Sequence, residues 1–392
     1  KNINFNKISR AESHLFFVNL KLPNRLDLDQ LITYYFQEWH KLVPVVDQQE
    51  FLKNYMKLMR SAENKFNDND MFGNEKFGAV AIIIVALALL GRVKCSLHSN
   101  DTSFAKGNQK SIRFIHSNKS SSTPFNSNYK NCDQEQPGVI NDNDATIRLL
   151  NYYHHLIKQI ISSSIVESCS MQSLQILSLA LSYTLNVGDI GSSYTLRGKV
   201  VSMGQQLRLH RCPSAVLSNS GSIVSKIQQS ERRILFWCIF ILDAFGSLQL
   251  GVPRLLKDYE IECALPFAND DAEDDNNTNI LMINNSPLSL VGKVSSLSLA
   301  MMRFSKILGN ILDSIFRRGG VTIDALGKSC IILEDLLENW RKDLPDHLKF
   351  TLDVNGVLKN HDYQNYSNKI LTTIVLYYQA KILIYLPVLA AE

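Results

Sequence analysis

Residues 231–266 read ERRILFWCIFILDAFGSLQLGVPRLLKDYEIECALP and contain the clearest helical pattern of the chain. Large apolar residues recur every three or four positions, Trp237 and Ile241 among them, which predicts a helix whose apolar face packs inward. Asp243 lies on the same helix, and a buried carboxylate requires a cationic partner because an isolated ion is costly in a protein interior. Pro253 then turns the chain into an extended link. We interpret the segment as core plus a charge pair.

Helical patterns continue on both sides of this segment, and patterns typical of strands are nearly absent. No repeat of fixed period occurs, which argues against a solenoid. Two polar stretches, 96–144 and 267–287, contain few large apolar residues and are predicted to be long loops. The sequence therefore predicts an all-α fold, with a linker at 1–25 and one large domain of about ten helices at 26–392. The predicted helices cover residues 26–39, 48–59, 76–93, 144–163, 171–186, 192–209, 226–250, 288–316, 321–340 and 368–389.

Charge, cysteine spacing and apolar run length argue against three kinds of function. The chain has 41 Lys and Arg against 37 Asp and Glu, and no run of basic residues forms the concentrated face that nucleic-acid binding requires. The seven cysteines contain no C-x-x-C spacing, so we predict reduced thiols and no metal site in this chain. The longest apolar run, 79–90, is shorter than the roughly 20 residues that cross a bilayer. We therefore expect a buried helix there and no membrane partner.

One string is typical of an enzyme. Residues 270–275 read DDAEDD and contain D-D-x-x-D through Asp270, Asp271 and Asp274. In the all-α class I terpenoid synthases such aspartates hold the magnesium ions that bind a diphosphate, and this requires carboxylates on adjacent helical turns. Here Asn and Asp residues surround the string, and no second metal-binding string follows. A solvated acidic loop is the favoured interpretation; we assign no catalytic or cofactor-binding residue and predict that the chain is not an enzyme.

The segment 231–266 resembles the regulatory middle homology domain of fungal zinc binuclear-cluster transcription factors. In that family the helix runs roughly E-x-R-R-x-x-W-x-x-x-x-x-D, and a G-x-P and a D-x-D/E-I-x-x-x-x-P string follow. The matching positions are Arg232, Arg233, Trp237, Asp243, Gly251, Pro253, Asp258, Ile261 and Pro266.

Three further strings resemble the family in the same order along the chain. Residues 34–51, YYFQEWHKLVPVVDQQEF, are similar to its opening helix, and 207–211, LRLHR, to the end of its central helical pair at His210 and Arg211. Residues 340–345, WRKDLP, are similar to the W-x-x-x-L-P before its final helix. The resemblance therefore covers most of residues 26–390.

The resemblance implies a regulatory domain that works in the nucleus. The family's DNA-reading module, six cysteines around two zinc ions, normally precedes this region and is not in this chain, so DNA would be bound only through that module. The start at Lys1 without Met indicates a fragment of a longer protein. The family's regulatory domains imply a small-molecule effector or a corepressor or coactivator protein as partner. The family often dimerises through a coiled coil, and no sustained heptad pattern is visible here.

Two alternatives stay open at this point. One is a magnesium-dependent, terpenoid-synthase-like enzyme that uses the aspartates of 270–275, and the other is a protein-interaction scaffold without a small ligand. Tyr377, Tyr378 and Tyr385 could line an effector pocket, although ordinary core packing is the favoured interpretation for aromatic residues at helical spacing.

Overall fold

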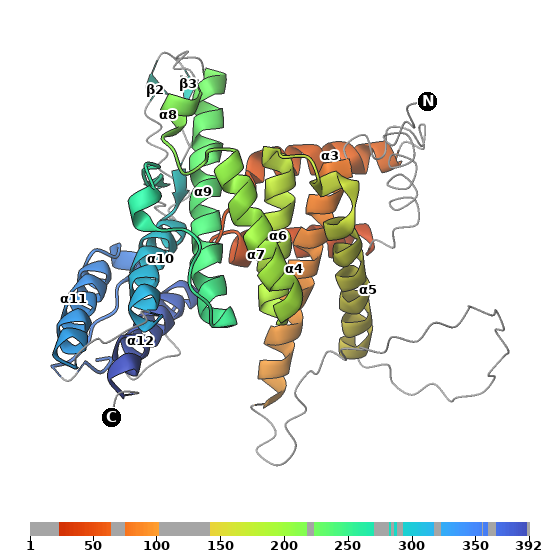
Figure 1. Ribbon diagram of the computed structural model, residues 1–392. Helices are drawn as coiled ribbons and strands as arrows, with labels where there is room; N and C mark the ends of the chain where they lie inside the picture. Colours follow the sequence, from red (N-terminus) through yellow and green to blue (C-terminus); the bar gives the residue numbers. More distant parts are fainter. Residues whose placement is uncertain are drawn as a thin grey trace, which may run out of the picture.

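The computed structural model of this chain is built almost wholly of helices (Figure 1). Within the residues that it describes the fold is all-α, as predicted, with two pairs of very short strands. The described residues are 23–63, 75–101, 142–217, 223–269, 282–283, 286–287, 293–316, 323–354, 356–359 and 366–389.

The N-terminal half packs around helix α4, Glu75–Asp101. Between residues 79 and 90 this helix is apolar on all sides, so it must be covered on all sides. Helices α2, α5 and α6 provide that cover, and the side chains of this stretch are almost entirely buried (Figure 1). The other elements of this half are α2 (Arg25–Tyr34), the π-helical turn η1 (Tyr35–Trp39), α3 (Gln48–Glu63), α5 (Asp142–Ser162), the 3₁₀ turn η2 (Ser164–Val166), α6 (Met171–Val187) and α7 (Ile190–Gln206).

A tight turn folds α7 back along α6. Gly188 ends α6 with a φ of 82°, a left-handed conformation that glycine adopts without steric cost. Asp189 then caps α7, because its side chain accepts a hydrogen bond from the backbone N–H of Ser192. The two helices therefore form an antiparallel pair, which presents one side of α7 to helix α9.

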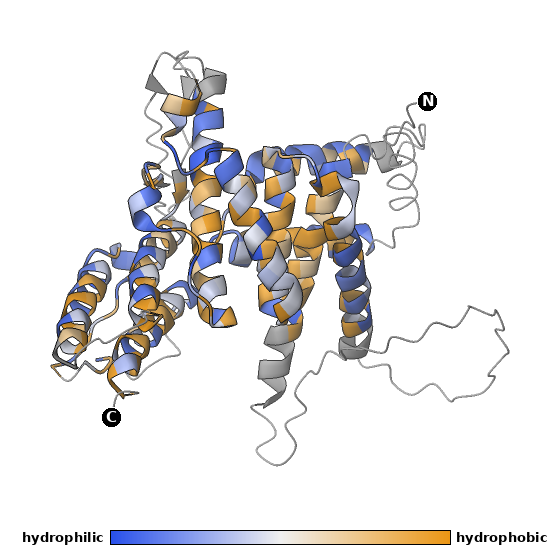
Figure 2. Ribbon diagram, viewed as in Figure 1, coloured by the Kyte–Doolittle hydropathy of each residue, from blue (hydrophilic) through white to orange (hydrophobic). Residues whose placement is uncertain are grey.

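Helix α9, Ile223–Leu250, lies between the two halves of the molecule. It packs against α6 and α7 on one side and against α10 on the other, and the part of the helix between these neighbours is apolar in sequence (Figure 2) and buried at residues 235–242. Trp237, Cys238 and Ile241 are buried as predicted. The remaining elements are α8 (Pro213–Val216), η3 (Asp258–Glu260), β1 (Phe267–Asn269), β2 (Met282–Ile283), β3 (Ser286–Pro287), β4 (Lys293–Ser295), α10 (Ser296–Ile315), α11 (Ile323–Lys342), η4 (Asp346–Leu348) and α12 (Asn368–Leu389).

The structure corrects several predicted boundaries. The helix predicted from residue 288 begins at Ser296, because Ser295 caps it and residues 293–295 pair with 267–269 as parallel strands. Strands β1, β2 and β3 therefore lie in the stretch predicted as loop, and α4 and α5 extend into both ends of 96–144. The rest of that predicted loop, 102–141, and the linker residues 1–22 lie outside the described residues.

The length argument against membrane-spanning segments was wrong. Three helical stretches are long and apolar enough to cross a bilayer by length and composition: Glu75–Val93, Lys226–Leu250 and Asn368–Leu389. Burial inside the fold accounts for the first two, whose apolar windows are 72% and 67% buried. The window in α12 is 33% buried, so a smaller share of this helix is enclosed by the fold than of the other two.

Candidate functional site at the end of helix α9

A buried ion pair joins α7 to α9. The Nε of Arg197 on α7 lies 2.7 Å from Oδ1 of Asp243 on α9, and the two side chains are 3% and 2% exposed. Arg197 crosses α9 at Gly246. A Cβ at position 246 would lie 3.3 Å from the Cδ of Arg197. This confirms the prediction that a buried Asp243 has a cationic partner. Ion pairs this deep are retained only where further hydrogen bonds satisfy both groups.

The further hydrogen bonds of this pair go to the segment that follows α9, residues 251–266, called here the link. Oδ2 of Asp243 accepts from the backbone N–H groups of Leu255 and Leu256, each at 2.9 Å. Nη2 of Arg197 donates to the Pro253 carbonyl at 2.8 Å and to Ser247 Oγ at 2.7 Å. Burial raises the pKa of Asp243, while the Arg197 guanidinium and the two amides oppose that shift. The pair therefore holds the link against both helices.

The turn between α9 and the link depends on Gly251. Its φ of 67° lies in the left-handed region that disfavours residues with a side chain. The backbone N–H of Val252 then returns to the Ser247 carbonyl at 3.0 Å. This reversal brings Pro253 and the following residues back alongside α9, within reach of Arg197.

A second charge cluster joins the link to α10. Nη2 of Arg254 lies 2.7 Å from Oδ2 of Asp313 on α10 and 3.3 Å from Oδ2 of Asp258. Lys257 Nζ reaches the other oxygen of Asp313 at 2.6 Å. The Arg254 side chain is buried and crosses α10 directly above Gly309, where a Cβ would lie 2.5 Å from Nη1. Consecutive residues of one turn, Pro253 and Arg254, thus connect α7 and α9 with α10.

The second cluster should make stability depend on pH. Burial alone would raise the pKa of Asp313, but hydrogen bonds from Arg254 and Lys257 outweigh it and hold the pKa below the ordinary 3.8. A lowered folded-state pKa means that the ionised carboxylate stabilises the fold above about pH 4, and that this contribution is lost as the pH falls through the folded-state pKa.

We therefore expect the Tm difference between the parent chain and Asp313→Asn to narrow as the pH is lowered from 6 to 3. Thermal unfolding followed by circular dichroism measures it. The matched control is Asp335→Asn on α11, an exposed aspartate that forms no ion pair within the described residues. A Tm difference that stays constant between pH 6 and pH 3 would contradict the ion pairs assigned to Asp313.

The rest of the link is attached near the ends of α7 and α9. The Trp237 indole N–H donates to the Ala264 carbonyl at 2.9 Å, and the His210 carbonyl accepts from the N–H groups of Glu262 and Cys263. Arg211 pairs with Glu262 at the surface. These bonds complete a continuous attachment of the link over its whole length.

The structure brings the motif residues from the sequence together around this link. Arg232 donates to the Leu207 carbonyl, which ties α9 to the end of α7, and Asp258 contacts Arg254. Pro266 is buried at the end of the link, whereas Arg233 Nε is buried without a hydrogen-bond partner. Sequence reasoning missed the three partners Arg197, Arg254 and Asp313. The need of a buried Asp243 for a cationic partner was the signal that could have found Arg197. Several arginines in the sequence met that requirement equally well.

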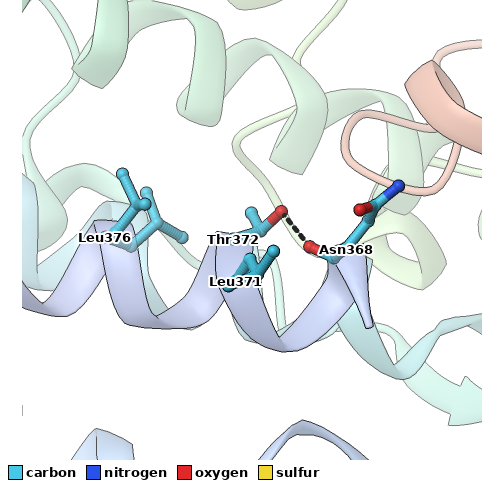
Figure 3. Close-up of a pocket in the computed structure, with 5 residues that line it drawn as sticks. Asn368, Leu371, Thr372 and Leu376 are labelled. Carbon is cyan, nitrogen blue, oxygen red and sulfur yellow. Dashed lines mark hydrogen bonds between the residues drawn. The ribbon is translucent and has the colours of Figure 1, made fainter. Parts of the chain in front are cut away.

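The described residues contain little evidence for the enzyme hypothesis. The aspartates of 270–275 lie outside them, and within them no three His, Cys, Asp or Glu side chains gather as metal ligands. The hydroxyls of Tyr377, Tyr378 and Tyr385 bond to Glu338, to the Gly356 carbonyl and to Glu334. The three tyrosines therefore fasten α12 to its neighbours. A surface hollow of about 370 Å³ on α12 is lined by Asn368, Leu371, Thr372, Val375 and Leu376 (Figure 3).

The comparison with protein families decides the class of this fold. The family described as the fungal-specific transcription factor domain matches residues 32–342, a range that includes both charge clusters and the link between them. This chain belongs to the fungal-specific transcription factor domain family. As a member of that family it is a transcription-regulatory domain and not an enzyme.

Named relatives of this fungal-specific transcription factor domain agree with the family match. The regulatory protein CAT8 of Saccharomyces cerevisiae is 35% identical over 95% of this chain, which covers 26% of CAT8. The transcriptional activator protein acu-15 of Neurospora crassa is 24% identical over 95% of the chain, which covers 32% of acu-15. The chain thus spans about a quarter to a third of these relatives. No solved structure shows significant similarity to it.

Proposed function

We propose that this chain is the regulatory domain of a fungal sequence-specific RNA polymerase II transcription factor that acts in the nucleus. The observation that carries the proposal is the 35% identity to CAT8 across 95% of the chain. In the proposed protein a zinc-cluster module N-terminal to this domain binds DNA, and the domain controls what that module and an activation segment do. The seven cysteines here lack the spacing of such a cluster, so zinc belongs to the other module.

The control that we propose operates through the link after α9. A regulator shifts a two-state equilibrium only by binding one state better than the other. The link is attached to α7 and α9 by Arg197 and Asp243 and to α10 by Arg254 and Asp313, so a change at either half is transmitted to the other through Pro253 and Arg254. An effector, either a small molecule or a coregulator protein, would bias this arrangement.

A reporter experiment tests the proposal. The whole chain is placed between a heterologous DNA-binding module and an activation segment in yeast, and reporter output is compared across a panel of growth conditions. We expect the chain to change the output by about five-fold or more between conditions, the lower end of typical allosteric coupling. We expect Arg254→Met to weaken that response while an exposed substitution, Lys328→Ala, leaves it intact.

Two results would count against the proposal. An output equal to that of a fusion without the chain, in every condition, would remove the regulatory role. Sequencing the gene upstream of Lys1 tests the DNA-binding part separately, since we expect a basic segment with C-x2-C-x6-C spacing there.

A further inference from the structure

Two cysteines lie near each other where the link passes the segment between α7 and α8. Cys263 belongs to the link, and its backbone N–H donates to the His210 carbonyl at 3.1 Å, two residues before Cys212. Burial raises the pKa of Cys263 to about 12, and the nearby Cys212 thiol adds to that rise. Cys263 is 3% exposed, whereas Cys212 is partly open to solvent. A surface thiol and a buried thiol therefore lie at the same contact.

Two arginines at this contact have no carboxylate partner. Within the described part of the chain neither Arg232 nor Arg233 forms an ion pair, and the Nε of Arg233 is buried without a hydrogen-bond partner. A guanidinium stays charged at physiological pH, and a buried charge is costly when no anion lies beside it. The charge of Arg233 reaches both thiols. A thiolate at this contact would supply the anion that Arg233 lacks.

The surroundings of the partly exposed thiol, Cys212, favour its ionisation. Its Sγ lies 3.1 Å from the Oγ of Ser214. Hydrogen bonds from the side chain and the N–H of Ser214, and then the charge of Arg233, lower the pKa of Cys212. The thiolate is the form that reacts with peroxides, and redox-active cysteines combine a lowered pKa with solvent access and a second cysteine nearby. Cys212 therefore has the properties of an attacking thiol and Cys263 those of a resolving thiol.

We propose that Cys212 and Cys263 are a peroxide-responsive pair that closes a reversible disulfide between the link and the segment before α8. The Cys212 thiolate attacks one oxygen of hydrogen peroxide, the O–O bond breaks, and hydroxide leaves as the sulfenic acid forms. The Cys263 sulfur then attacks the sulfenic sulfur, the S–O bond breaks, and the departing hydroxyl takes the Cys263 proton to form water. The two sulfurs together lose two electrons and the peroxide gains them.

Closing this disulfide should hold the link more firmly. Glu262 and Cys263 already donate to the His210 carbonyl, and the next residue, Ala264, accepts from the Trp237 indole. The disulfide therefore joins segments that are in contact in the reduced chain, and it restricts the unfolded chain over the whole of residues 212–263. We expect the oxidised chain to have a higher Tm than the reduced chain, and Cys212→Ser to abolish this difference.

Mass spectrometry of the oxidised 392-residue chain tests the pairing. The reduced chain is treated with hydrogen peroxide at neutral pH, the remaining thiols are blocked with iodoacetamide, and the digest is analysed without reduction. We expect a cross-linked peptide that joins positions 212 and 263 and disappears on treatment with dithiothreitol. We also expect Cys212 to lose its free thiol about five-fold faster than the exposed Cys169, which has no arginine assigned to it.

Three serine variants separate the roles of the two thiols. In Cys263→Ser the sulfenic acid on Cys212 has no resolving partner, so it should persist and react with dimedone. In Cys212→Ser the thiol of Cys263 should stay reduced, because it is buried and its attacking partner is gone. The matched control is Cys169→Ser, which removes an exposed cysteine outside the pair and should leave the cross-linked peptide unchanged. Circular dichroism checks that each variant is folded.

Two results would overturn the proposal. One is a folded chain in which peroxide oxidises Cys169 while positions 212 and 263 keep their free thiols. The other is a disulfide of Cys263 that still forms in Cys212→Ser, since another cysteine would then be its partner. The proposal does not rest on the proposed regulatory function: the peptide map can show the disulfide even if reporter output never changes, and its absence leaves the reporter experiment valid.

Discussion

Replacing Arg197 by Met is expected to lower the free energy of unfolding by about 3–5 kcal/mol, the usual cost of breaking a buried ion pair from one side. The substitution leaves the buried Asp243 carboxylate with only the two amide donors of Leu255 and Leu256. It also removes the Arg197 group that donates to Ser247 Oγ and to the Pro253 carbonyl. Urea unfolding at pH 7 followed by circular dichroism measures the loss as a lower midpoint.

A control variant and a double variant test the reason for this loss of stability. Lys199 lies on the same helix, is partly exposed and forms no ion pair within the described residues, so the unfolding midpoint of Lys199→Met should match that of the parent. Arg197→Met combined with Asp243→Leu removes the buried charge as well, and it should be less destabilised than Arg197→Met alone. A single Arg197→Met variant within about 0.5 kcal/mol of the parent would contradict the assigned role.

Replacing Gly309 by Ala should also destabilise the fold, by about 1–3 kcal/mol, because the core at this point has no room for a methyl group. The new Cβ would lie 2.5 Å from Nη1 and 2.8 Å from Cζ of Arg254. Arg254 is held by Asp313 and Asp258, so it cannot move aside without losing those ion pairs. Thermal and urea unfolding of the variant measure the effect.

The matched control, Gly327→Ala, should change the stability of the fold in the opposite direction. Gly327 on α11 has nothing within 4 Å of a Cβ, so Gly327→Ala should stabilise the chain by about 0.5–1 kcal/mol through the higher helix propensity of alanine. If both variants were stabilised, Arg254 would not be packed against α10 in the way described. The pair thus separates local crowding from helix propensity.

Together these results would locate where the two halves of the domain are connected. Arg197 and Asp243 hold the link on one side and Arg254 and Asp313 hold it on the other, and all of these contacts fall within the four consecutive residues 253–256. A loss of stability at both clusters with a loss of reporter response would indicate that the connection carries regulation as well as structure.

Much of the fold could be predicted from local pattern. The helix at 76–93 follows from its long apolar run, which is uncharged between Lys76 and Arg92. Helix α6 ends at Gly188 because glycine adopts the left-handed conformation at little cost. The start of α10 could not be predicted in this way. The apolar residues of 288–294 continue the spacing of the helix, but residues 293–295 pair with β1, and such pairing between separate segments leaves no local signal.

The candidate site was predictable only in part. The motif string drew attention to Asp243, and the cost of a buried charge required a cation beside it. Arg232, Arg233 and Arg254 are all nearer to Asp243 in sequence than its partner Arg197, which is 46 positions away. Helical periodicity assigns a residue to a face but not to a neighbour, so the choice among arginines depended on how α7 packs against α9.

The amino-acid sequence alone accounts for the helices, the polar character of the segments between them and the need for a charge partner at Asp243. These properties depend on residues within a few turns of one another. Packing of the whole chain determined the rest. It selected Arg197 and placed Arg254 over Gly309, and it left Val375 and Ile382 of α12 exposed. Those outcomes depend on distances between segments far apart in the sequence, and only the folded chain sets such distances.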